Sequence, residues 1–166
     1  MTEFTLTSPP AAWPLLFTYR SPVLGKGFIS VVSMTGRLLA RQEDGRVWLD
    51  GVTPGALALP SADVRTASQD LHNTLTAVFA DLAEEADSFD AFRASVQQFF
   101  LDTDDESVAE WKMCVAAVQS GLLKGPEGLP VVAADSPVAV EVIQKPLETV
   151  TAKDNAATPP QLSAAA

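Results

Sequence analysis

Residues 37–63 read RLLARQEDGRVWLDGVTPGALALPSAD, and this stretch decides the predicted fold. The pair Asp44-Gly45 accepts the two positive-φ positions of a type I′ turn, and the residues on either side suit strands, so a β-hairpin is predicted. Pro54-Gly55 then breaks the chain before a short apolar run. A hairpin, a turn and a short strand that lead into a helix are typical of a small α+β module.

A long amphipathic helix is predicted to follow, and either Ser61 or Asp63 can cap its N-terminus. Apolar residues recur there at steps of three and four, which places them on one face of the helix. These residues are Val64, Ala67, Leu71, Leu75, Phe79, Leu82 and Ala86. We expect this face to pack on the sheet, with Leu75 opposite Leu49.

Two shorter helices are predicted after the long one. Ser88 caps the first, and the acidic run 102–106 ends it and begins the second, where carboxylates favour the positive end of the helix dipole. Gly121 or Gly125 ends the second helix. Their apolar residues are Phe89, Phe92, Val96, Phe99 and Phe100 in the first, and Val108, Trp111, Val115, Val118 and Leu122 in the second.

A first strand is predicted upstream of the hairpin at residues 27–33, and a turn near residues 34–36 joins it to the strand that begins at Arg37. One face of the sheet then collects the residues expected to pack on the long helix: Ile29, Val31, Leu38, Ala40, Val47 and Leu49. The predicted fold class is α+β, with a small antiparallel sheet of three to four strands, one long helix packed on one face, and two further helices.

The opposite face of this sheet is the candidate binding surface. It collects Phe28, Val32, Arg37, Leu39, Arg41, Arg46 and Trp48. Arg41 lies directly across from Trp48, which permits a cation–π contact. A sheet covered on one side only has a mostly polar second face, so the apolar residues here indicate a cover: the N-terminal arm, a second copy of the chain, or a partner. Tryptophan and arginine dominate binding hot spots, so the candidate binding residues are Trp48, Arg37, Leu39, Arg41 and Arg46.

The 166 residues are predicted to divide into three parts. Residues 1–24 hold four prolines among aromatic residues, which suits an extended N-terminal arm that lies on the domain. Residues 25–125 form the single α+β domain. Residues 126–166 are rich in proline and alanine and are expected to be largely disordered, with a possible edge strand at 137–145. Residues 147–166 are expected to be dispensable for stability.

The net charge of −10 is concentrated on the predicted helices, because residues 63–110 contain twelve Asp/Glu and only two Lys/Arg. Such a surface repels phosphates and would attract a basic protein, although acidic helices also serve solubility alone. No apolar run approaches the length of a membrane helix, and no signal peptide is evident. The single cysteine excludes an internal disulfide framework. We therefore expect a cytoplasmic protein.

No residue pattern supports catalysis, a metal site or a cofactor. His72 lies four residues after Ser68, but Asp70 falls off their face and no nucleophile-elbow motif surrounds the serine. Cys114 lies beside an apolar helix face, which predicts a buried, inert thiol. The acidic run 102–106 lacks the glycine and the spacing of a calcium loop. A protein without enzymatic activity is predicted.

The sequence EDGRVWL at residues 43–49, the Pro54-Gly55 pair and the helix segment 71–82 resemble the HicB-type antitoxin family. In that family a β-hairpin with a turn such as Asp-Gly precedes a Pro-Gly signature, a short strand and one helix that packs across a sheet of three or four strands. The resemblance covers residues 28–86. The family's Gly-Asp/Glu-Thr sequence before the helix is replaced here by PSAD, and no DNA-binding helix-turn-helix or ribbon-helix-helix follows.

The resemblance implies a protein-binding module that masks the surface of a partner, a small basic ribonuclease in that family, and that often forms oligomers. The missing DNA-binding segment removes the expectation of direct DNA binding. An alternative is a homo-oligomeric accessory or structural protein whose exposed sheet face serves only a homodimer. A hydrolase that uses His72 ranks last.

Overall fold

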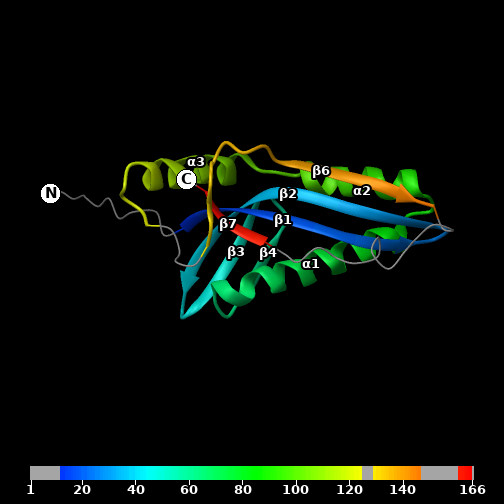
Figure 1. Ribbon diagram of the computed structural model, residues 1–166, viewed down its shortest axis with the longest axis horizontal. Coiled ribbons are helices and arrows are strands. Elements are labelled where there is room, and N and C mark those ends of the chain that lie inside the picture. The colour runs from blue at the N-terminus through cyan, green and yellow to red at the C-terminus, as the bar shows by residue number, and fades with distance from the viewer. Residues whose placement is uncertain (1–11, 125–128, 147–160, 166) are drawn as a thin grey trace.

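The computed structural model describes residues 12–124, 129–146 and 161–165. In this part of the chain a mixed sheet of seven strands carries three helices (Figure 1). The strands are β1 (Ala12–Gly25), β2 (Phe28–Glu43), β3 (Arg46–Thr53), β4 (Ala58–Ser61), β5 (Val131–Val132), β6 (Ala139–Lys145) and β7 (Gln161–Ala165), and the helices are α1 (Val64–Glu85), α2 (Phe89–Leu101) and α3 (Asp105–Gln119). The α+β class is confirmed, but the sheet is larger than the predicted three to four strands.

β1 and β2 form one long antiparallel hairpin, whose pairs run from Ala12 with Arg41 to Gly25 with Phe28. β2 passes straight through residues 34–36, so the turn predicted there is wrong. The glycine that suggested a turn has another role: Gly36 pairs with Phe17, and a Cβ at position 36 would collide with the ring of Phe17. A glycine inside a strand therefore makes room for an aromatic side chain.

β2 is the centre of the sheet because it has neighbours on both sides along most of its length. β1 borders one side throughout, whereas the other side is shared by β6, which pairs with residues 29–35, and β3, which pairs with residues 37–43. The predicted turn between β2 and β3 is confirmed, with φ of 52° at Asp44 and 78° at Gly45. The full strand order is β4-β3-β2-β1-β7-β5, with β6 beside β2.

Because β2 has no internal turn, its side chains alternate between the two faces without interruption. Its residues in the main core are Phe28, Val32, Met34, Leu38 and Ala40. Ile29 and Val31 lie on the other face. The predicted grouping of Ile29 and Val31 with Leu38 is therefore wrong, and so is the placement of Phe28 and Val32 on the outer face, because a turn at residues 34–36 would have reversed this alternation.

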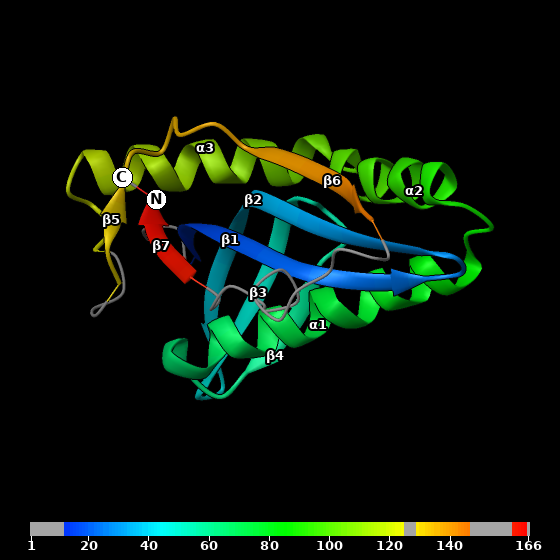
Figure 2. The same ribbon diagram turned by 45° about the vertical axis from the view of Figure 1, so that its right-hand side comes forward.

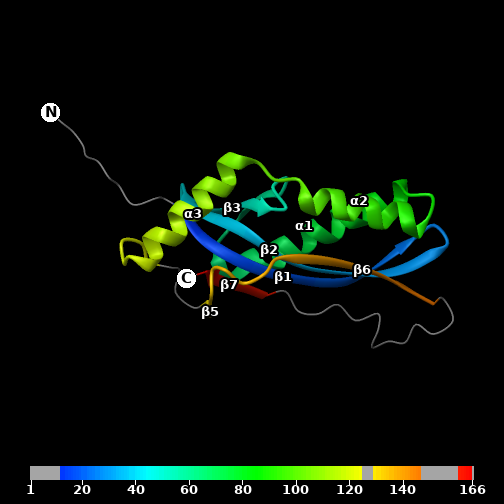
Figure 3. The ribbon, with the colours of Figure 1, turned by 90° about the horizontal axis from the view of Figure 1, so that it is seen from above.

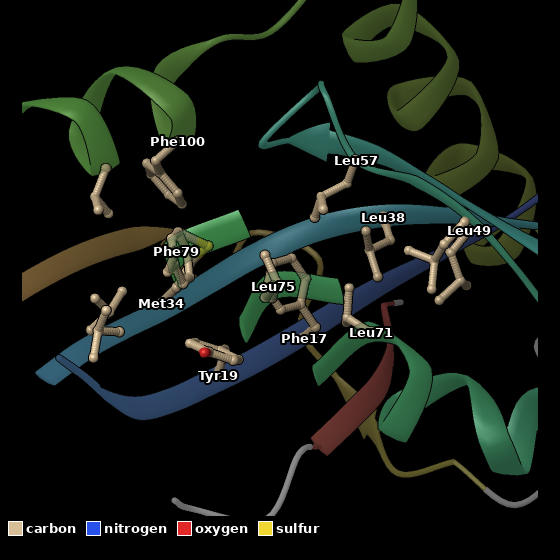
Figure 4. Close-up of a cluster of buried hydrophobic side chains, with 14 of the residues drawn as sticks. Phe17, Tyr19, Met34, Leu38, Leu49, Leu57, Leu71, Leu75, Phe79 and Phe100 are labelled. Carbon is tan, nitrogen blue, oxygen red and sulfur yellow. The ribbon is translucent and has the colours of Figure 1, made fainter. Parts of the chain in front are cut away.

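The main core lies between this face of the sheet and helices α1 and α2 (Figure 4). Asp63 caps α1 by accepting a hydrogen bond from the backbone N–H of Thr66, and Ser88 caps α2 in the same way. The buried residues of α1 are Ala67, Leu71, Leu75, Phe79 and Ala83, close to the predicted set. Leu49 and Leu75 are both fully buried in this core.

α3 covers the opposite face of the sheet, so α1 and α3 lie on opposite sides of the strands (Figure 2). A second core forms beneath α3, where Trp111 and Cys114 lie against residues of β1, β2 and β3. Its buried members are Ala12, Leu16, Leu39, Val52, Trp111, Cys114, Ala134 and Ala165. The sheet was predicted to carry helices on one face only. At the end beneath α3 it carries helices on both faces.

The expected N-terminal arm and tail contribute strands to the sheet. Residues 12–24 are extended as predicted, but they form nearly all of β1, and Phe17 is buried in the main core. The possible edge strand is present as β6. β7 also comes from the expected disordered tail, and Leu162 and Ala164 pair with β1 and are buried. Small residues bury well in a strand, which a count of large apolar residues overlooks.

The remaining parts of the expected arm and tail, residues 1–11, 125–128, 147–160 and 166, lie outside the described residues.

Candidate functional site

The centre of the predicted binding face is covered by α3 of the same chain. Leu39 is only 1% exposed and belongs to the core beneath α3. The guanidinium of Arg37 lies 5.5 Å from the centre of the Trp111 ring, a cation–π contact across the same interface. The cover is therefore neither the arm, a second copy nor a partner, and Leu39 and Arg37, two of the five candidate residues, already contact this part of the fold.

Arg41 forms ion pairs with a residue of the sheet and with a residue of α3. Its Nε donates to Asp50 Oδ2 at 2.9 Å, and its Nη2 donates to Glu110 Oε1 at 2.6 Å. The hydrogen bond to Glu110 raises the pKa of Arg41, while partial burial opposes this effect. Arg41 pairs with Trp48 in the sheet as expected, but its charged group turns to carboxylates. Arg41 of β2 therefore links α3 to the sheet.

Trp48 and Arg46 remain at the margin of the predicted face, where Trp48 is half-buried and Arg46 is exposed. A polar hollow of about 290 Å³ lies between the N-terminal part of α3 and residues of β2, β3 and β4, and neither Trp48 nor Arg46 lines it. Its ionisable lining consists of Arg41, Asp50, Asp104, Glu106 and Glu110. Within the described ranges, no group of three or more His, Cys, Asp or Glu side chains is arranged to hold a metal ion.

The residues considered for catalysis are engaged elsewhere. The His72 ring lies 5.1 Å from the Tyr19 ring, and Asp70 Oδ2 accepts a hydrogen bond from Ser61 Oγ at 2.6 Å. No hydrogen bond of the described chain joins His72 to Ser68. Cys114 is buried as predicted, and burial, aided by Glu110, raises the pKa of its thiol. A raised thiol pKa lowers the thiolate fraction, which disfavours a nucleophilic role.

A more open hollow, of about 770 Å³, lies between α1 and α2, and we call it the α1–α2 groove. Its lining residues are Leu82, Ser95, Gln98, Phe99, Leu101 and Asp102. Phe99 meets Phe79 edge-on with ring centres 5.9 Å apart, so the floor of the groove is anchored in the main core. Leu101, by contrast, is 71% exposed. The groove therefore presents apolar side chains to solvent.

Asp102 is the one acidic side chain in the lining of this groove, and further carboxylates follow Leu82 along the chain. Glu85 lies one helical turn beyond Leu82 on α1. The exposed carboxylates of the α1–α2 corner are Asp81, Glu84, Glu85, Asp87 and Asp90. Among the described residues, only Asp90 of this set forms an ion pair, with Arg93 at 3.3 Å. The corner between the two helices that form the groove therefore carries an excess of negative charge among the described residues.

Sequence reasoning found these carboxylates but not the groove. A signal was present in Phe99-Phe100-Leu101, because three consecutive apolar residues of a helix cannot all face one core. Phe100 is buried, Phe99 is half-buried in the groove, and Leu101 is exposed. The depth of the groove depends on how α1 and α2 cross, which the sequence pattern does not specify.

Comparisons with known proteins found no match among family models, curated proteins or solved structures. None of the described helices is both long enough and apolar enough to cross a membrane.

Proposed function

We propose that this chain is a non-enzymatic protein-binding module that masks the surface of a basic protein partner by means of the α1–α2 groove. One observation carries the proposal: an open groove with the apolar residues Leu82, Phe99 and Leu101, with Asp102 in its lining and exposed carboxylates at the corner between its two helices. Apolar grooves between helices accept the apolar face of a partner helix or segment. The negative charge selects partners that are rich in lysine and arginine.

The two parts of this surface have different effects on binding. Burial of the exposed Leu101 side chain would supply affinity through the hydrophobic effect. The carboxylates would raise the association rate of a basic partner and reject acidic ones, an effect that salt weakens. Nucleic acid is disfavoured as a ligand because the same carboxylates repel phosphate.

The resemblance to HicB-type antitoxins suggests the same kind of partner, a small basic ribonuclease. The helices that carry the groove differ in origin: α1 lies within the resembling segment, whereas α2 lies beyond it. The proposed binding surface is therefore partly an addition to that module. It also replaces the outer sheet face as the site, because α3 covers the centre of that face.

A model ligand tests the chemistry of the groove directly. The probe is a labelled designed helix with lysine on its polar face and leucine on its apolar face, compared with the same helix carrying glutamate in place of lysine. Fluorescence anisotropy should detect binding of the lysine helix only. Leu101→Ser should weaken it by about tenfold, the cost of leaving one leucine-sized contact unmade. Met113→Ser is the matched control, because Met113 is 63% exposed on α3.

The native partner is then the protein that the wild type and Met113→Ser retain from cell extract and that Leu101→Ser loses. Glu85→Gln should also reduce retention, while Glu43→Gln, at the exposed β2–β3 turn, should not. Equal binding of the lysine helix by Leu101→Ser and Met113→Ser would refute the groove as the site. Equal binding of the glutamate helix would refute the preference for basic partners.

A further inference from the structure

The outer half of the β1–β2 hairpin, where residues 18–25 pair with residues 28–35, has one face that no described helix covers. Both α1 and α2 lie on the other side of these strands (Figure 3). On the open face Leu24 is 70% exposed, and Ile143 of β6 is 41% exposed. Large apolar side chains are thus left in solvent on an ordered sheet, which is typical of an interaction surface.

The strand register arranges this face in rows that run across β1, β2 and β6. The middle row is apolar and consists of Pro22, Val31 and Ile143. Val31 is only 3% exposed, so Ile143, at 41%, is the exposed end of this row. The rows on either side end in opposite charges on β6, with Glu141 at the end of one and Lys145 at the end of the other. The apolar row therefore reaches the edge of the sheet between a negative and a positive side chain.

β6 is an edge strand. It pairs with β2 on one side, and no described strand pairs with its other side. Its seven residues leave a row of backbone N–H and C=O groups available for a further strand. Glu141 and Lys145 have no ion-pair partner among the described residues, although both lie beside this edge.

We propose that β6 pairs antiparallel with β6 of a second copy of this chain, about a two-fold axis at Ile143. This register places Ile143 opposite its counterpart and Glu141 opposite Lys145 of the second copy, twice by symmetry. The apolar rows of the two copies then join into one row of six residues across a continuous sheet.

The charges favour a second copy over a strand of another protein. Glu141 and Lys145 lie at equal distances from Ile143 on the same face of β6, so the strand is complementary to itself in this register. Val142 belongs to the main core and stays within its own copy. The proposed dimer does not depend on the function proposed for the α1–α2 groove.

Charge reversal in the full-length chain tests both the edge and the register. Glu141→Lys and Lys145→Glu each place like charges opposite each other at two positions, so each variant should raise the dimer dissociation constant by about tenfold or more. An equimolar mixture of the two variants should form heterodimers, because every pair is then opposite in sign. The double variant Glu141→Lys/Lys145→Glu should dimerise like the wild type.

Sedimentation equilibrium measures these states, and circular dichroism checks that the substitutions at the exposed Glu141 and the half-buried Lys145 leave the fold intact. Lys112→Glu on α3 and Glu43→Lys are the matched controls, and both should remain dimeric. A wild type that stays monomeric at high concentration overturns the proposal. Single variants that dimerise as well as the wild type also overturn it, as does a double variant that remains monomeric.

Discussion

The two halves of the β1–β2 hairpin differ in how they are covered. The inner half, where residues 12–17 pair with residues 36–41, lies between α1 and α3, whereas the outer half has helices on one face only. The local sequence reflects this difference: the inner half of β1 reads AWPLLF, and the outer half reads TYRSPVLG. A strand buried on both faces is continuously apolar, and a strand buried on one face alternates.

The largest effect is expected in the core that both halves share. Leu75 is fully buried there, so Leu75→Ala should reduce the free energy of unfolding by about 2 to 5 kcal/mol, through lost burial and the remaining cavity. Chemical denaturation measures this loss. Met113→Ala, at an exposed position of α3, is the control and should change stability by less than about 0.5 kcal/mol. A Leu75→Ala loss as small as that of the control would mean that α1 does not pack on the sheet.

A matched pair of leucines on the same face of β1 tests the difference between the halves. Leu16 is 4% exposed beneath α3, and Leu24 is 70% exposed in the outer half. Leu16→Ala should cost about 2 to 3 kcal/mol, and Leu24→Ala less than about 0.5 kcal/mol, in urea denaturation at low protein concentration. Equal costs would show that both halves of this face are covered.

β7 pairs with the inner half of β1, so weakening the packing of β7 should reduce the stability of the fold. Leu162 is buried in the main core, and Leu162→Ala should cost about 2 kcal/mol. Thermal unfolding should show a drop in Tm of several degrees for this variant. The exposed Gln161 provides the control, since Gln161→Ala leaves the core intact. Identical Tm values for both variants would show that β7 contributes nothing to the fold.

The smallest effect concerns the ion pairs that join α3 to the inner half. Arg41, Asp50 and Glu110 are each at least 30% exposed in their side chains, so solvent screens their attraction. A double-mutant cycle with Arg41→Met and Glu110→Gln should give a coupling energy below about 1 kcal/mol, and added salt should reduce it. A coupling of several kcal/mol would mean that this contact, and not the core beneath α3, holds the helix.

The elements set by local chemistry were predicted well. The Asp44-Gly45 turn and the Ser88 cap follow from neighbouring residues. The structure also selects one of two predicted alternatives at each of two helix ends: Asp63 over Ser61 as the cap of α1, and Gly121, with φ of 80°, over Gly125 after α3. One local signal was ambiguous, because Gly36 suits a turn as well as it suits a strand that accommodates Phe17.

The features that failed depend on contacts between residues far apart in the chain. α3 packs on the sheet through a buried cluster that contains Trp111 and Leu39. β7 pairs with β1 through a segment that contains Leu162 and two alanines. Neither contact produces a periodic pattern of apolar residues in the segment that makes it. The candidate binding residues were grouped correctly around Arg41 and Trp48, but the helix that occupies most of that face was not anticipated.

The pairing of β7 with β1 also has a kinetic consequence. Ala164 pairs with Leu15, so the sheet is completed by two segments from opposite ends of the described chain. Closing so long a loop costs much chain entropy before any contact offsets it, and folding rates fall as contacting residues become more distant in sequence. The β1–β2 hairpin can form early from neighbouring residues, whereas β1 presents an unpaired edge until β7 arrives. The chain is thus most prone to mispairing with other chains during the interval between these two events.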